Sequence, residues 1–294
     1  MLVSHGRYNY TPITKRPTYR WPNGAGVAFY IALNIEHYSF DEGLAEDLVP
    51  GMSKPDVLNS TWREYGTRVG AWRLMDLFKS LDLPVSILLN SEVCDHCPEL
   101  VSAFVDAGYE IAGHGRTNSE SQAGFSEARE RALIDSVSLK IAEICGRRPT
   151  GWLSPWLAET AQTPDLINEA DYKYVMDWCP DDQPIWLKTR KGKLLSMPYS
   201  QEINDSAAII GRQVDADKFA DMIIDQIEEL VTQSTEVPLV FGLALHANIM
   251  GQPFRLRQLR RALAHIQSLG DKVWTTRGCD IADYVLADPV NRII

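Results

Sequence analysis

Short apolar segments alternate with longer segments of helical spacing along this sequence, and the alternation limits what the chain can fold into. The apolar segments are rich in β-branched and aromatic residues, as strands are. They cover 26–34, 83–90, 109–113, the residues near 151, 172–178, 193–199, 238–246 and 272–276. Apolar residues recur at helical spacing in 67–81, 97–108, 127–146 and 215–234. Largely apolar strands with helices between them predict an α/β fold with a mainly parallel sheet covered by helices.

At 294 residues, a (β/α) barrel is the simplest way to close such a sheet. Neither a break in composition nor a low-complexity linker divides the chain. We therefore predict a single domain over 1–294, built as a distorted barrel, with an N-terminal extension over 1–25.

The charge balance bears on the class of partner. The chain has 29 basic and 39 acidic residues, a net charge of -10, and its basic residues are scattered apart from 255–261. We therefore expect no nucleic acid partner. No run approaches the roughly 20 apolar residues of a membrane span, so we expect no membrane association. Five cysteines, an odd number, and no apolar signal segment indicate a reducing compartment and predict a cytoplasmic protein.

One cysteine pattern offers two interpretations. Cys94 and Cys97 form a single Cys-x-x-Cys, and the remaining cysteines supply no second pair. A closed zinc site needs four ligands, so we interpret this motif as ordinary cysteines at the start of a helix. Their redox state is left open.

Polar residues gather where the predicted strands end. Asn34, Glu36 and His37 follow the first strand, and His114 and Asn118 follow the strand over 109–113. In a barrel, the carboxyl ends of parallel strands form one face, where catalytic residues collect. Residues from several strands can therefore converge on one pocket.

Three later strands end in the same way. The segment "WLSPW", residues 152–156, follows the strand near 151, Asp177 and Trp178 end the next, and His246 ends the strand over 238–246. The alternative for each histidine is that it is a hydrogen-bonded core residue.

The order of these motifs resembles the polysaccharide deacetylase (NodB-homology) superfamily, carbohydrate esterase family 4, and especially its allantoinase-like and cyclic-imide-hydrolase-like branch. The first motif, Thr-Phe-Asp-Asp in deacetylases, matches 34–37, where Asn34 and Glu36 fit the Asn-aromatic-Glu-Glu of that branch. The second, His-Ser/Thr-x-x-His, matches 114–118 with asparagine at its last position. The fifth appears as "LALH", and the following His-x-x-x-x-Gly-x-Pro-x-Arg resembles the same branch.

The resemblance spans about residues 20–285 and departs from the family at two further places. His37 stands where the allantoinase-like branch has a second glutamate, and "WLSPW" lacks the arginine of the third deacetylase motif.

The family resemblance implies a distorted (β/α) barrel of the NodB-homology type that hydrolyses a carbon–nitrogen bond, mostly an amide. Carried over, Glu36 is the general base and His246 the general acid. His37, His114 and Asn118 take the positions of ligands to a divalent metal, with zinc favoured by imidazole ligands. Such a metal activates water and polarises the carbonyl. The allantoinase-like branch is reported to work without a metal, so metal-independent catalysis stays an alternative.

Substrate class follows from the surroundings of these motifs. An insertion over 41–80 after the first motif is expected to cap a pocket for a small molecule. Asn34, Trp156, Asp177 and Trp178 are the predicted substrate-binding residues, the two tryptophans as flat apolar walls. We favour a cyclic amide or imide as substrate and expect a homo-oligomer. The alternatives are a polysaccharide or small-molecule N-deacetylase, and a non-catalytic binding protein on the same fold.

Overall fold

The computed structural model describes residues 4–293, and its centre is one sheet. Nine strands belong to it within the described residues: β1 (Val27–Ile35), β2 (Val85–Leu89), β3 (Glu110–Gly113), β4 (Gly151–Trp152), β5 (Tyr174–Val175), β6 (Ile185–Thr189), β7 (Gly192–Ser196), β8 (Leu239–His246) and β9 (Val273–Thr276). Every predicted strand is present, although β5 is shorter than 172–178.

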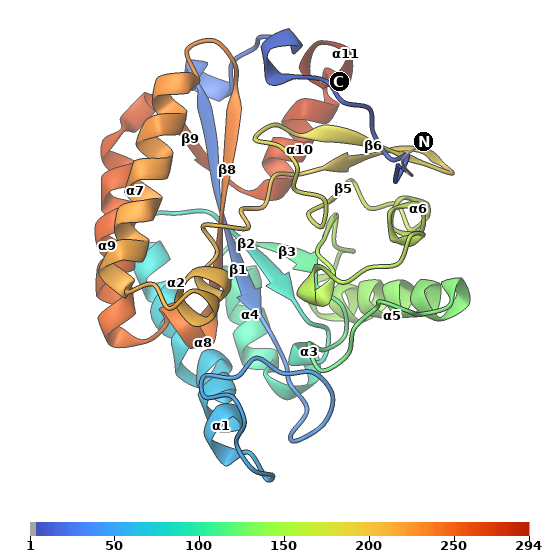
Figure 1. Cartoon of the computed structure of the whole chain (residues 1–294), viewed down its shortest axis with the longest axis vertical. Coiled ribbons are helices and arrows are strands. Elements are labelled where there is room, and N and C mark those ends of the chain that lie inside the picture. Colours follow the sequence, from blue (N-terminus) through green and yellow to red (C-terminus); the bar gives the residue numbers. More distant parts are fainter. Residues whose placement is uncertain (1–3, 294) are drawn as a thin grey trace.

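The strand order is β6-β7-β5-β4-β3-β2-β1-β8, with β9 beside the first half of β1. All these pairs are parallel except the β6–β7 hairpin. The sheet curls into a half-barrel, as Figure 1 shows, which confirms the predicted α/β class with mainly parallel strands. β6 was not predicted, because only alternate residues of this edge strand are buried and the segment is not continuously apolar.

No ladder joins β6 to β8 among the described residues, and loops occupy the gap instead. The amide of Val240 donates to the carbonyl of Asp182 (2.8 Å), and that of Ser200 donates to the carbonyl of Gly242 (3.2 Å). An isolated parallel bridge then pairs Asn204 with Ala244. The chain from 198 to 205 therefore runs beside the second half of β8 and follows it towards its carboxyl end.

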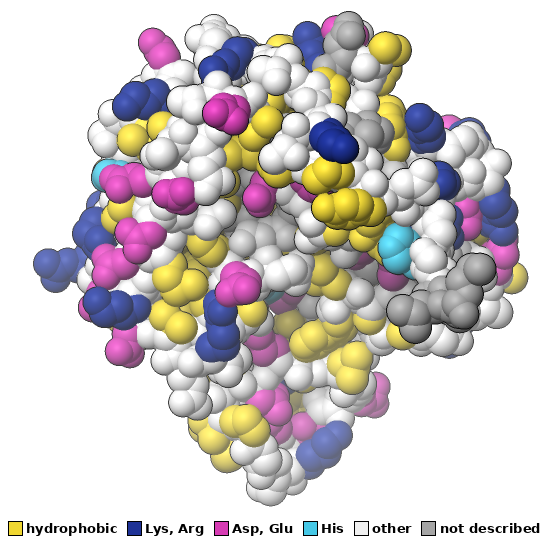
Figure 2. Space-filling model, turned by 45° about the horizontal axis from the view of Figure 1, so that its top comes forward, with side chains coloured by type: hydrophobic (Ala, Val, Ile, Leu, Met, Phe, Trp, Pro, Cys, Tyr) yellow, Lys and Arg dark blue, Asp and Glu magenta, His cyan; other side chains and the backbone are white. Residues whose placement is uncertain are grey.

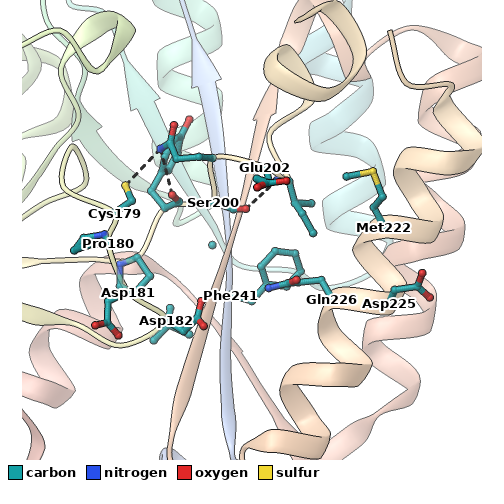
Figure 3. A pocket seen from close by; sticks show the side chains of 16 residues that line it. Cys179, Pro180, Asp181, Asp182, Ser200, Glu202, Met222, Asp225, Gln226 and Phe241 are labelled. Atoms are coloured by element: carbon teal, nitrogen blue, oxygen red, sulfur yellow. Dashed lines mark hydrogen bonds between the residues drawn. The ribbon is translucent and has the colours of Figure 1, made fainter. Parts of the chain in front are cut away.

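The gap also holds a cavity of about 670 Å³ between these loops, β8 and α7 (Ala216–Gln233) (Figure 3). Its lining includes Cys179, Glu202 and Phe241. Glu36, His114 and His246, which follow or end the strands, do not line it.

Helices cover the sheet. They are α1 (Val57–Tyr65), α2 (Ala71–Ser80), α3 (Val93–His96), α4 (Pro98–Asp106), α5 (Glu127–Cys145), α6 (Thr163–Glu169), α7, α8 (Ala247–Met250), α9 (Pro253–Ser268), α10 (Gly278–Leu286) and α11 (Pro289–Arg292). The four predicted helical segments are confirmed as α2, α4, α5 and α7. In Figure 1, α7 and α9 lie side by side along β8, and α1 projects beyond the carboxyl end of β1.

β1 is the centre of the core. All nine of its residues are buried, because the strand has neighbours on both edges and packed side chains on both faces. This burial explains why the sequence of the strand is an almost unbroken apolar run. It also fixes the position of the residues that follow Ile35.

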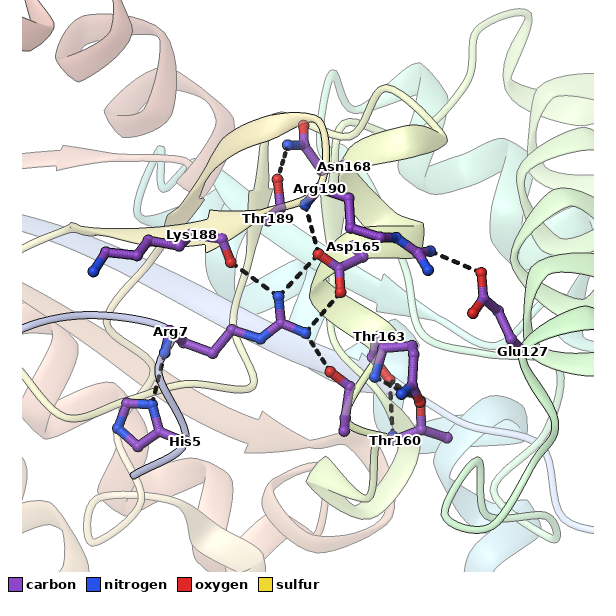
Figure 4. Close-up of polar contacts among 12 residues, drawn as sticks. His5, Arg7, Glu127, Thr160, Thr163, Asp165, Asn168, Lys188, Thr189 and Arg190 are labelled. Atoms are coloured by element: carbon purple, nitrogen blue, oxygen red, sulfur yellow. Dashed lines mark hydrogen bonds and ion pairs between the residues drawn. The ribbon is translucent and has the colours of Figure 1, made fainter. Parts of the chain in front are cut away.

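The N-terminal segment is tied down by charge pairs (Figure 4). The Arg7 guanidinium binds both carboxylate oxygens of Asp165, at 2.9 and 2.8 Å, and donates to the Lys188 carbonyl at 2.9 Å. The amide of Arg190 donates to the same carboxylate at 2.8 Å. Arg16 pairs with Asp181 further along. The segment is thereby held against α6 and the β6–β7 hairpin.

The outer surface is mixed in character. On the face in Figure 2, basic side chains are spread among acidic and hydrophobic ones, and acidic groups lie around a hollow near its middle. No helix within residues 4–293 has the length and apolar character needed to span a membrane.

Candidate active site

The register of the sheet brings the ends of β1 and β8 together. Asn34 lies opposite His246 in the parallel β1–β8 ladder, so Glu36, two residues further on, emerges beside the imidazole. β3 ends at Gly113 on the other side of β2, which brings His114 to the same edge. Three strands therefore deliver a carboxylate and two imidazoles to one place.

Glu36 is the centre of this cluster, and only 7% of its side chain is exposed. Its Oε1 accepts a hydrogen bond from Asn118 Nδ2 at 2.6 Å and lies 3.4 Å from His114 Nε2 and 3.6 Å from His246 Nε2. Its Oε2 accepts from the Tyr38 hydroxyl at 2.8 Å. Burial by itself disfavours the charged form, yet the nearby His246 and His114 and the hydrogen bond from Tyr38 hold the pKa of Glu36 below its ordinary value. Glu36 is therefore an ionised carboxylate at neutral pH.

His246 is held between two carboxylates. Its Nδ1 donates to Asp205 Oδ1 at 2.6 Å, and its backbone amide donates to Asp205 Oδ2 at 2.8 Å. Burial alone would lower the pKa of His246, but the charges of Asp205 and Glu36 outweigh it and raise this pKa to about 10. The ring is thus an imidazolium at neutral pH, with Nε2–H directed at Glu36.

His114 is oriented by its other ring nitrogen. Nδ1 donates to the Leu153 carbonyl at 2.8 Å, which directs Nε2 towards Glu36. The loop carrying Leu153 is held in turn by Asp177, which accepts from the Ser154 amide at 2.7 Å and from its hydroxyl at 3.1 Å. Burial raises the pKa of Asp177 to about 7.

A cavity of about 200 Å³ lies over this cluster. Six of the nine predicted site residues line it: Asn34, Glu36, His114, Asn118, Trp156 and His246. Trp156 adopts a left-handed backbone (φ 63°), a conformation that costs a bulky residue energy, and its indole donates to the Asn118 carbonyl at 2.8 Å.

Asp177 and Trp178 do not line this cavity. The carboxylate of Asp177 is turned towards Ser154. The indole of Trp178 donates to Glu159 at 2.6 Å and packs against His5 and Tyr8 of the N-terminal segment. Both residues support the walls of the site, whereas the sequence placed them against the substrate.

His37 also takes a different direction from its neighbour. Its ring stacks on His96, with centroids 4.4 Å apart, and its Nδ1 lies 3.3 Å from the Thr117 hydroxyl. Together with His96 and Arg63 it lines a second cavity, of about 230 Å³, which shares Glu36 and Tyr38 with the first.

A metal held by His37, His114 and Asn118 does not fit this arrangement. His37 and His114 line different cavities. The Asn118 amide directs its nitrogen at Glu36, while its oxygen accepts from Asn90 at 3.0 Å. Within residues 4–293, no group of three or more His, Cys, Asp and Glu side chains has the geometry of a metal site.

Sequence reasoning missed four residues at the cluster: Tyr38, Glu46, Tyr199 and Asp205. Asp205 was hidden because it lies in an irregular stretch between β7 and α7. The only signal for it was chemical, since a histidine that acts as a general acid needs a partner at its other nitrogen.

Known proteins share this framework. The family model for polysaccharide deacetylases matches residues 55–175. A peptidoglycan deacetylase of Helicobacter pylori is 26% identical over 257 residues, covering 76% of this chain and 87% of the relative.

Solved structures resemble most of the chain. The crystal structure of Puue allantoinase superposes with a TM-score of 0.80 at 26% identity, over 95% of both chains. A probable polysaccharide deacetylase from Pseudomonas aeruginosa superposes with a TM-score of 0.82 at 27% identity, over 95% of this chain and 96% of the other. With the curled parallel sheet and the cluster at its carboxyl edge, the chain is thus similar to polysaccharide deacetylases and to an allantoinase over most of its length.

Proposed function

We propose that this chain hydrolyses the carbon–nitrogen bond of a small cyclic amide or imide, with Glu36 as general base and His246 as general acid. The observation that carries the proposal is the pair itself: an ionised carboxylate and an imidazolium share one small cavity, 3.6 Å apart. Hydrolysis of an amide needs one group that accepts a proton from water and another that donates one to the leaving nitrogen.

The size and cover of the cavity favour a small substrate. Its volume of about 200 Å³ is below the roughly 300–1,000 Å³ of common ligand pockets. Glu46, from the insertion over 41–80, forms part of its wall, so the insertion contributes to the boundary of the site. A polymer chain needs a long groove that is open at both ends, whereas a five- or six-membered ring fits a cavity of this volume.

The reaction balances with these two groups. Glu36 takes a proton from water as the oxygen attacks the carbonyl carbon, and the carbon–nitrogen bond then breaks. His246 transfers its Nε2 proton to the leaving nitrogen, and the proton that Glu36 took from water then returns to His246 Nε2, 3.6 Å away. One water is consumed, the ring opens to a carboxylic acid and an amine or amide, and both groups regain their starting protonation states. Tyr38 and Asn118 hold the carboxylate in place through their hydrogen bonds. No step passes through a metal, because the predicted ligands do not assemble around one.

The first test is the substitution Glu36→Gln, which keeps the shape of the side chain and removes the base. We expect kcat to fall by about 10²–10⁴-fold, the usual contribution of acid–base catalysis, while circular dichroism and the unfolding midpoint stay unchanged. Activity is read on a panel that contains succinimide, hydantoin, linear amides and N-acetylglucosamine.

The panel is run after chelation and again with added zinc. Turnover of N-acetylglucosamine alone would favour the deacetylase alternative, and full activity in Glu36→Gln would remove Glu36 from the mechanism. Activity that is lost on chelation and restored by zinc would show that a metal takes part after all.

A further inference from the structure

Two buried polar atoms on the wall of the catalytic cavity lack a hydrogen-bond partner. They are Asn34 Oδ1 and Glu46 Oε2, each buried and without a hydrogen-bond partner among the described residues. Leaving a buried polar atom unpaired costs about 1–3 kcal/mol, so most such atoms in folded proteins find partners. Both residues line the same cavity, where an entering molecule can supply what the protein does not.

The other polar atoms of these two side chains are engaged, which fixes the direction of the unpaired ones. Asn34 Nδ2 donates to the Tyr199 hydroxyl at 3.1 Å and to the Leu245 carbonyl at 3.0 Å. Glu46 Oε1 accepts from the Ser206 hydroxyl, and its backbone carbonyl accepts from Arg63 at 2.7 Å. Neither side chain can turn away without losing a hydrogen bond that it already makes.

The surroundings of Glu46 favour its neutral form. Burial and the nearby charges of Glu36 and Asp205 raise the pKa of Glu46, although His246 opposes the shift. Because the Ser206 hydroxyl donates to Oε1, the proton of a neutral Glu46 sits on Oε2. Oε2 is then a hydrogen-bond donor, whereas Asn34 Oδ1 is always an acceptor.

We propose that Glu46 is a substrate-recognition residue whose Oε2–H donates to a carbonyl oxygen of the substrate, while Asn34 Oδ1 accepts from its N–H. The class of ligand is an uncharged amide with a free N–H, which presents one acceptor and one donor. This inference rests on the proposed function for the identity of the reaction, but the contacts concern binding alone. It also gives the insertion over 41–80 a direct part in specificity.

Binding is measured without turnover, with 2-pyrrolidinone as the probe. This lactam has the required carbonyl and N–H but is an unactivated amide, and N-methyl-2-pyrrolidinone is its matched control without the N–H. We expect the wild-type protein to bind the lactam about tenfold more tightly than the N-methyl compound, which is the value of one net hydrogen bond. Equal binding of the two compounds would overturn the role of Asn34.

Glu46→Ala should weaken binding of 2-pyrrolidinone by about tenfold, whereas Glu46→Gln, whose amide also donates, should stay within about threefold of wild type. Glu42→Ala, an exposed carboxylate of the same insertion, is the matched control and should bind like wild type. Equal losses in Glu46→Ala and Glu46→Gln would show that Glu46 does not act as a neutral donor, and no loss in either would remove it from the site.

A separate measurement tests the proposal even if the alanine variant misfolds. In wild-type protein labelled with ¹³C at glutamate carboxyls, the signal that Glu46→Gln removes should titrate above the ordinary range of glutamate and shift on addition of 2-pyrrolidinone. A signal that titrates in the ordinary range and ignores the lactam would contradict the proposal. Since neither readout needs catalysis, a chain that hydrolyses nothing on the panel still passes or fails this test.

Discussion

At the scale of single residues, the site moves the pKa values of its base and acid in opposite directions. Glu36 has a pKa below its ordinary value, and His246 has one raised to about 10. A base must be ionised and an acid protonated, so activity should fall as pH drops through the pKa of Glu36 and as pH rises through that of His246. We expect kcat/KM to form a broad plateau with its acid limb below pH 4.5 and its alkaline limb near pH 10.

The substitution Asp205→Asn tests the origin of the alkaline limb. Asparagine can still accept the Nδ1 hydrogen bond, but it lacks the charge that stabilises the imidazolium. The pKa of His246 should therefore fall, and the alkaline limb of kcat/KM should move down by about 1–3 pH units. A pH–rate profile of each protein measures this shift. An alkaline limb that stays near pH 10 would show that some group other than His246 sets it.

His37 shows where sequence reasoning fails at this scale. The sequence placed Glu36 and His37 correctly after a buried strand, because the apolar run that ends at Ile35 is plain. It could not tell that His37 lines only the second cavity, whereas Glu36 lines both. Along an extended backbone, successive side chains point to opposite sides, whereas residues two apart point to the same side. Tyr38, two residues after Glu36, is the one that contacts it.

At the scale of elements, the insertion is held over the site by close backbone packing. Gly66 and Gly70 bound the π-helical turn η3 (Gly66–Gly70) between α1 and α2, and this turn packs on α8 directly after His246. A Cβ on Gly70 would lie 2.0 Å from the Ala247 carbonyl oxygen, and one on Gly251 would lie 2.2 Å from Gly70 Cα. Glycine is thus required at both positions, and Gly251 is the glycine five residues after the histidine in the motif.

We expect Gly70→Ala to lower the free energy of unfolding by about 1–3 kcal/mol, because the added methyl must push α8 away from the insertion. kcat should fall as well, since α8 begins at the residue after His246. Gly211→Ala is the control, as its Cβ would meet nothing closer than 3.7 Å. Urea denaturation and steady-state kinetics measure both effects. If Gly70→Ala were as stable as Gly211→Ala, the packing of the insertion would not be as close as the structure has it.

The same scale shows what could be predicted of the fold. Strands buried on both faces have continuous apolar sequences. For this reason the predicted bounds of β1, β2 and β8 lie within two residues of the observed ones. The contact between η3 and α8 joins segments about 180 residues apart, and no pattern in either segment predicts that they are in contact. For the same reason Asp205 was missed, since its position depends on a loop that pairs with β8.

At the scale of the whole molecule, the residues of the candidate site come from two parts, the sheet and the insertion. The sheet supplies Glu36, His114 and His246 at its carboxyl edge, while the insertion over 41–80 supplies Glu46 to the wall of the cavity. The insertion also exposes an unusual number of large apolar side chains: Phe40, just before it, and Leu44, Leu48, Val49, Met52, Val57 and Leu58 are each at least 40% exposed. Exposed apolar residues gathered in one segment are typical of surfaces that bind another protein.

We predict that this surface joins copies of the chain into a homo-oligomer. Light scattering should then give a mass that is a multiple of the 33.1 kDa of one chain. A double substitution, Leu48→Asp with Val57→Asp, places like charges at the contact and should reduce the mass to that of the monomer. Val290→Asp, an exposed apolar position outside the insertion, should leave the mass unchanged. A wild-type mass near 33 kDa would contradict the oligomer, and an unchanged mass in the double variant would place the interface elsewhere.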